Sequence, residues 1–173
     1  MKTEPKEIER LHFEESENIP NHPNFPVLLY RGALDADEGP LAEAFESCYQ
    51  KNDWRGAWRW GVYDFHHYHS NAHEVLGVAS GEAELKLGGP KGRTVTVRAG
   101  DVVVLPAGTG HMNVGSSGDF QVVGAYPAGQ ENKDLIRNDE PLDDTIRERI
   151  KNVARPTADP IFGEDGPLLS EWK

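Results

Sequence analysis

Four of the seven histidines in this 173-residue chain, His66, His67, His69 and His73, lie within eight residues of one another. Alternate side chains of a β-strand share a face, so His67 and His69 can present two imidazole nitrogens to one point, while His66 points away. Imidazole nitrogens that meet in this way are typical ligands of a divalent metal. The spacing therefore predicts a metal site that includes His67 and His69.

Two further side chains can complete this site. Glu74 follows a Ser-Asn-Ala turn and can bring a carboxylate to the same point from the neighbouring antiparallel strand. His111 follows the Gly-rich turn 106–110 and is the natural fourth ligand. In regular strands the side chains of His66 and His73 point away from the site. They are expected at the surface or beside the ligands, unless a bulge turns His73 inward.

Two polar side chains near the four expected ligands are candidates for a substrate pocket. Tyr63 shares the parity of His67 and is either a hydrogen-bonding group or general acid in the pocket, or an aromatic residue of the core. Asn113 shares the face of His111. It is either a partner for substrate or metal-bound water, or an ordinary asparagine at the end of a strand.

The chain around these candidates has the pattern of an all-β protein. Short runs rich in Val, Thr and aromatic residues alternate with Gly, Asn and Pro. Strands are predicted over 58–69, 74–80, 83–87, 94–98, 102–105, 111–114 and 120–126. In the first of these strands Trp58, Trp60 and Val62 would lie opposite His67, on an outer face that a helix, the C-terminal tail or a second copy must cover. Such strand spacing indicates a sandwich or a barrel.

The flanking regions have a different composition. Residues 1–26 are acidic and then rich in Pro and Asn, which predicts an arm with solvated His12 and His22. A strand over 27–30 and a helix over 40–51 follow, with Cys48 in the apolar stripe of the helix. A second helix is expected over 141–153. The tail 154–173 either covers the body or is loosely ordered.

Composition excludes several classes of protein. Eighteen Lys and Arg against 29 Asp and Glu give a net charge of −11, which disfavours nucleic acid and anionic membranes as partners. The longest aliphatic run, 102–105, is far too short to span a bilayer. The chain has one cysteine, so no intramolecular disulfide can form. No secretory signal follows Met1, and a cytoplasmic location is expected.

Two motifs resemble those of the cupin superfamily, in its small bacterial single-domain form. The first motif has its fixed positions at Gly61, His67, His69, Glu74 and Gly81. The second has them at Gly100, Pro106, Gly108 and His111. One departure is Gly115, which stands where the family often has Asn. The resemblance covers residues 54–127.

This resemblance implies a cupin jelly-roll barrel, commonly dimeric, with a divalent metal held by the matching residues His67, His69, Glu74 and His111. Three imidazoles and one carboxylate suit Fe(II), Mn(II), Ni(II), Cu(II) or Zn(II), and an octahedral ion would keep two positions for other ligands. The ligand types do not choose among these metals.

We therefore expect one domain, residues 1–173, with a barrel core over 54–127. The N-terminal arm and helix take up 1–53, and the C-terminal helix and tail take up 128–173. The expected function is binding of a small organic molecule at the metal, either as a dioxygenase, decarboxylase or isomerase or as a noncatalytic binding module. A homodimer is expected, and nucleic acid and membranes are not expected as partners.

Overall fold

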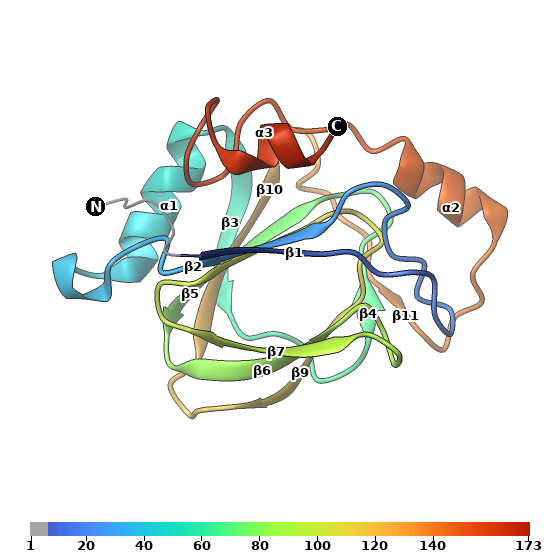
Figure 1. Cartoon of the computed structure of the whole chain (residues 1–173), viewed down its shortest axis with the longest axis horizontal. Coiled ribbons are helices and arrows are strands. Elements are labelled where there is room, and N and C mark those ends of the chain that lie inside the picture. Colours follow the sequence, from blue (N-terminus) through green and yellow to red (C-terminus); the bar gives the residue numbers. More distant parts are fainter. Residues whose placement is uncertain (1–6) are drawn as a thin grey trace.

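The computed structural model describes residues 7–173, which form two antiparallel β-sheets packed face to face (Figure 1). The first sheet has six strands in the order β1 (Glu7–Leu11), β2 (Val27–Arg31), β8 (Val102–Leu105), β5 (Glu74–Ser80), β10 (Gln121–Pro127) and β3 (Trp54–Trp60). The second has five strands in the order β11 (Ile136–Arg137), β4 (His67–Tyr68), β9 (His111–Ser116), β6 (Glu82–Leu87) and β7 (Arg93–Arg98). The all-β, jelly-roll prediction is confirmed.

Four helical segments of residues 7–173 lie outside the sheets. They are a 3₁₀ turn at Ala36–Glu38, α1 (Leu41–Lys51), α2 (Asp144–Lys151) and α3 (Pro167–Glu171). The helix expected over 141–153 begins later, because Asp143 is its N-cap and accepts a hydrogen bond from the backbone N–H of Ile146. Within the described residues, no helix has the length and apolar character needed to cross a membrane.

The six-stranded sheet is buried on both faces. In β2, for example, Leu29 packs between the sheets, whereas Leu28 and Tyr30 belong to a second core on the other side. This explains why β2 and β8 are unbroken apolar runs rather than alternating ones. Helices α1 and α3 lie on the side of this sheet away from β6, β7 and β9 (Figure 1).

Helix α1 approaches the sheet closely because β5 has a glycine beneath it. A Cβ atom at Gly77 would lie 2.7 Å from the Phe45 ring and 2.7 Å from the Tyr49 hydroxyl oxygen. The Tyr49 hydroxyl donates a hydrogen bond to the carbonyl of Val123 in β10. Gly77 therefore lets both rings of the helix rest directly on the sheet.

The C-terminal segment (residues 154–173) covers the outer core, which is the apolar cluster around Leu28 and Tyr30 on the face of the six-stranded sheet away from the second sheet. This was one of the two expected arrangements of the segment. Ile161, Leu168 and Trp172 are fully buried there. Asp159 organises the segment, because its buried carboxylate accepts hydrogen bonds from the Tyr30 hydroxyl and from three backbone N–H groups, those of Ile161, Phe162 and Leu168. One carboxylate thus fastens the end of the chain to β2.

The N-terminal region is not the loose arm that its composition predicted, over the part that the structure describes. Strand β1 pairs with β2, and Ile19 and His22 are buried. The Asn21 side chain donates to the carbonyls of Glu14 and Gly88 and accepts from the N–H of Gly110. These bonds replace regular secondary structure, so the segment packs without any hydrophobic periodicity.

His22 was expected to be solvated, and that prediction is wrong. Its Nδ1 accepts hydrogen bonds from the backbone N–H groups of Asn24 and Phe25, at 3.1 and 2.9 Å. Burial, with a smaller contribution from His12, lowers the pKa of His22 to about 4. The folded protein therefore holds this ring neutral, since protonation of Nδ1 would remove both bonds.

This burial predicts a pH-dependent stability. Below about pH 6.5 the unfolded chain protonates His22, while the folded chain does not until about pH 4, so the unfolded state gains protons and stability falls across that window. His22→Asn keeps an acceptor for the same N–H groups without titrating. We expect wild type to lose about 2 kcal/mol relative to His22→Asn between pH 7 and pH 4. Urea unfolding at several pH values measures this difference, and a constant difference would contradict the prediction.

The strand predicted over 58–69 is two strands. β3 ends at Trp60, residues 61–66 are irregular, and β4 has only His67 and Tyr68. The alternation of side-chain faces along a strand therefore does not continue from Trp58 to His67. Trp58 pairs with Gly124 in β10 and packs between the sheets.

The expected outer face of Trp58, Trp60 and Val62 is thus a wrong prediction. All three line a cavity between the sheets. Gly124 makes room for the indole of Trp58, because a Cβ atom at Gly124 would lie 2.3 Å from that ring. Trp58 is thus covered within the protein, whereas Trp60 is largely exposed, and the homodimer stays a prediction.

Candidate metal centre

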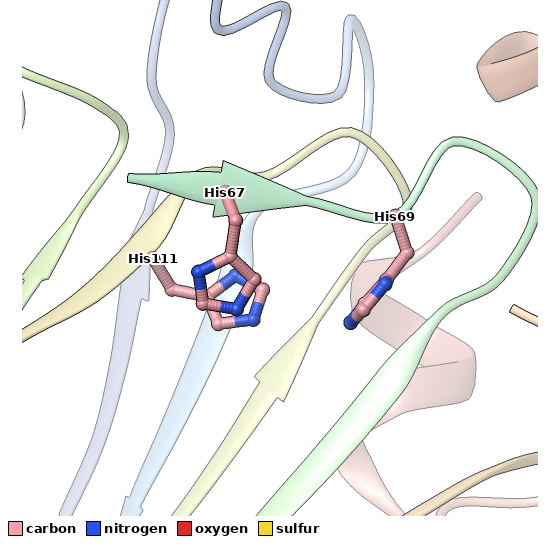
Figure 2. A group of neighbouring side chains, drawn as sticks. All are labelled: His67, His69 and His111. Atoms are coloured by element: carbon pink, nitrogen blue, oxygen red, sulfur yellow. The ribbon is translucent and has the colours of Figure 1, made fainter. Parts of the chain in front are cut away.

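Three histidines meet between the two sheets. His67 lies in β4, His69 follows that strand, and His111 begins β9, where it is the register partner of His67. One ligating atom from each ring lies within 4.8 Å of the other two, and all three side chains are buried. Figure 2 shows His67 and His69 on the same side of β4, with the His111 ring beside that of His67.

Each ring is held by a backbone carbonyl. The Nδ1 atoms of His67 and His111 lie 2.9 and 3.0 Å from the carbonyl oxygens of Phe65 and Thr109, and Nδ1 of His69 bonds to the carbonyl of Asp134. A carbonyl only accepts, so each Nδ1 must donate. The lone pair of each neutral ring is therefore on Nε2. This is the tautomer that a metal ligand needs, with the second nitrogen oriented by a backbone group.

Glu74 joins the three histidines from the opposite sheet. Its Oε2 lies 3.4 Å from Nε2 of His69, and its Oε1 lies 3.2 Å from Nε2 of His111. Glu74 is the first residue of β5, so it reaches across the space between the sheets rather than from a strand paired with β4. The side chains of all four sequence-predicted ligands are thus gathered at one place.

The electrostatics of this group call for a cation. Burial disfavours the charged carboxylate, but His69 and His111 outweigh burial and hold the pKa of Glu74 well below its usual range. Burial also opposes protonation of His69, yet Glu74 outweighs it and raises the pKa of His69. Burial, followed by His111, lowers the pKa of His67 to about 2. A carboxylate facing imidazole lone pairs is repulsive unless a proton or a metal ion lies between them, and three imidazoles with one carboxylate fit a divalent transition metal.

A tyrosine that sequence reasoning missed orients Glu74. The Tyr126 hydroxyl donates to Oε2 of Glu74 at 2.9 Å and accepts from the indole N–H of Trp58 at 2.8 Å. Burial and the nearby Glu74 raise the pKa of Tyr126, so the hydroxyl keeps its proton. The sequence predicts that Tyr126 lies in a strand. Because both faces of β10 are apolar, the sequence does not reveal which face points into the space between the sheets.

Loss of this hydroxyl is expected to weaken metal binding. In Tyr126→Phe the Glu74 carboxylate loses its donor, and a lost orienting partner typically costs 10- to 100-fold in metal affinity. We expect a loss of about tenfold, measured by competition with a chelator of known affinity. Tyr63→Phe is the matched control, because no hydrogen bond joins its hydroxyl to the ligands among the described residues. Equal affinities in the two variants would contradict the prediction.

A cavity of about 240 Å³ opens beside the four side chains. Its lining residues are Trp58, Trp60, Gly61, Val62, Tyr63, His67, His69, Glu74, Leu76, His111, Tyr126 and Lys133. Tyr63 is among them. Asn113 is not, and its side chain donates instead to the Ser116 hydroxyl at 3.2 Å.

The two remaining histidines of the cluster lie apart from this group. His66 is half-buried beside β4. His73 is fully buried, and its Nδ1 accepts from the N–H of Ala107 at 2.8 Å, with its ring 4.9 Å from that of Trp172. The expectation of a surface or site-adjacent position is wrong for His73, which packs beneath the C-terminal segment because the turn before β5 directs it to the outer core.

Comparisons with known proteins agree with this architecture. The family model described as "Cupin domain" matches residues 61–123. The uncharacterized protein YjlB of Bacillus subtilis is 40% identical over 167 residues, which cover 96% of this chain and 98% of YjlB.

Two solved structures show weaker likeness. Procruciferin, an 11S globulin from Brassica napus, is 20% identical with a TM-score of 0.39; the match covers 47% of this chain and 21% of the globulin, so it spans about a fifth of that longer protein. The acireductone dioxygenase from Bacillus anthracis, with cadmium in its active centre, is 16% identical with a TM-score of 0.37, covering 71% of this chain and 79% of that one.

Proposed function

The chain belongs to the cupin family, and from this premise we propose that it is a metalloprotein that acts on a small organic molecule. One divalent transition metal would be held by His67, His69, Glu74 and His111, and the molecule would enter the adjacent cavity. The observation that carries the proposal is the common tautomer of the three histidines, each of which turns its Nε2 lone pair inward while a carbonyl holds Nδ1.

The residues around the ligands have distinct roles in this proposal. A bound divalent metal supplies Lewis acidity to a substrate oxygen and lowers the pKa of bound water. Tyr126 keeps a proton on its hydroxyl and holds Glu74 in place. Tyr63 has a side chain at the cavity wall and can donate a hydrogen bond to a substrate oxygen. Trp58 and Leu76 form apolar walls that limit access of water.

Three reaction classes fit this arrangement: dioxygenation, decarboxylation and isomerisation. In each of them a substrate with adjacent oxygens would bind at the metal held by the four side chains, and the metal would polarise it. A dioxygenase would work with Fe, Ni or Cu and consume oxygen, whereas a decarboxylase or isomerase would work anaerobically with Mn or Zn. The identity of the metal thus directs the choice of assay.

A noncatalytic metal- and ligand-binding module is the second candidate, and one observation favours it. Among the residues that line the cavity, Glu74 is the only carboxylate, and it belongs to the proposed ligand set. A separate carboxylate base is therefore lacking from that lining. Turnover of any substrate by the metal-loaded protein would exclude this alternative.

The first experiment measures the metals bound to protein purified anaerobically without a histidine tag, by elemental mass spectrometry. About one Fe, Ni or Cu per chain leads to oxygen-uptake assays with diols and keto acids, and one Mn or Zn leads to assays of carbon dioxide release and isomerisation. Absence of metal after reloading with each of the five ions would overturn the proposal. Sedimentation of the same sample tests the homodimer that we also propose.

A further inference from the structure

Lys133 is the only Lys or Arg among the residues that line the cavity. Its ammonium nitrogen lies 4.9 Å from the centroid of the Tyr126 ring, the same ring whose hydroxyl donates to Glu74. A cation over an aromatic face is attracted to the ring but keeps its other donors available. Lys133 therefore places positive charge on the wall of the cavity, on the side of Glu74 and Tyr126.

The backbone around Lys133 is fixed to the turn that carries His69. Asn71 donates from its side chain to the carbonyl of Asn132 and accepts from the N–H of Asp134, at 3.2 and 2.9 Å. The Asp134 carboxylate accepts from the N–H of Ser70 at 2.7 Å, and the Asp134 carbonyl bonds to the His69 ring. Both neighbours of Lys133 are thus tied to residues 69–71, so this lysine and a proposed metal ligand share one support.

Within residues 7–173, no carboxylate forms an ion pair with Lys133. The carboxylates that do form ion pairs contact other basic side chains, mostly arginines. Arg59, for example, contacts both Glu43 and Glu46. Among the described lysines only Lys151 forms an ion pair, so what distinguishes Lys133 is its place in the lining of the cavity. Its natural complement is an anionic group on the molecule that enters.

Trp60 and Tyr63 line the same cavity and offer apolar surface instead of charge. Trp60 is 62% exposed and Tyr63 is 39% exposed, and their rings meet edge to face with centroids 5.2 Å apart. Large exposed aromatic residues beside a cavity offer apolar contact to a ligand. A cavity of about 150 Å³ can hold benzene, so 240 Å³ is enough for a phenyl-sized body with one carboxylate.

We infer that the cavity selects a small organic acid, with its carboxylate against Lys133 and its apolar body against Trp60 and Tyr63. The inference rests on the proposed function in one respect, because it assigns the ligand to the cavity beside the proposed metal. It goes further in naming the chemical class of that ligand and the residue that recognises its charge.

The test compares two probes of the same shape, phenylacetate and phenylacetamide, by calorimetry and by quenching of tryptophan fluorescence. Each is titrated into the full chain, both metal-free and metal-loaded. We expect phenylacetate to bind about fivefold more tightly, which is the contribution of one exposed charge pair. Lys133→Met should remove this preference and leave phenylacetamide binding within about twofold of wild type, while Lys133→Arg should retain it.

Lys91→Met is the matched control, because it removes the same charge from an exposed turn outside the cavity lining. Equal binding of the two probes to wild type would overturn the inference, as would an equal loss of preference in Lys91→Met. A preference that persists in Lys133→Met and requires metal would overturn the role of Lys133 while supporting the metal site. A Lys133-dependent preference in a protein that binds no metal would support the inference while the proposed function fails.

Discussion

Replacement of His111 by alanine is expected to abolish the proposed metal binding while the two sheets remain folded. His111 supplies an inward Nε2 next to Glu74, and its register partner in β4 is His67, so its loss removes one of the four proposed ligands. Loss of a ligand should cost more than the roughly 100-fold that loss of an orienting partner can cost. We expect metal content to fall from about one ion per chain to below about one-tenth, measured by elemental mass spectrometry.

The neighbouring His66 provides the control for this experiment. It belongs to the same histidine-rich stretch but is outside the group of converging ligands. His66→Ala should therefore retain wild-type metal content. Circular dichroism of His111→Ala should match that of metal-free wild type. Normal metal content in His111→Ala, or equal loss in both variants, would refute the ligand set.

Replacement of Asp159 by alanine is expected to give a large loss of stability. The substitution leaves the buried hydroxyl of Tyr30 and three backbone N–H groups without their shared acceptor. Removal of one partner from a buried charged hydrogen-bond group typically costs 3 to 5 kcal/mol. We expect the free energy of unfolding to fall by about 4 kcal/mol and Tm to fall on the order of 10 °C, as measured by urea and thermal unfolding.

Asp165→Ala is the matched control, because Asp165 belongs to the same segment but is exposed. Its stability should remain within about 0.5 kcal/mol of wild type. Limited proteolysis should cleave residues 154–173 faster in Asp159→Ala than in either reference protein. Similar stabilities for the two variants would show that the C-terminal segment is held by its apolar contacts instead.

Strands with strong local signals were predictable from the sequence. β5 and β8 have the predicted bounds, because apolar runs there are bounded by Gly, Pro or Asn residues. The N-terminal segment was not predictable in this way. Asn21 joins two backbone groups that are distant in sequence, and His22 caps a turn, so their burial depends on partners that no local pattern reveals.

The candidate metal ligands were more accessible to sequence reasoning than the cavity around them. The spacing of His67 and His69 predicted a shared face, whereas the face of Trp58 was wrong because the irregular stretch 61–66 interrupts the alternation. Tyr126 and Lys133 were missed. The carbonyl-bound tautomers were missed as well, since backbone partners such as Asp134 depend on folding rather than on residue type.

The order of strands in the larger sheet also has a consequence for shortened forms of this chain. The segment matched as a cupin domain, residues 61–123, excludes β1, β2 and β3. The segment also ends within β10, so β8 would lose its partner β2 and β5 would keep only the first three residues of β10, with α1 and the C-terminal segment no longer covering the apolar face of the sheet. Exposed, flat and apolar edges pair with other chains. An excised 61–123 fragment is therefore expected to aggregate, because the flanking residues that cover its edges and its apolar face are missing.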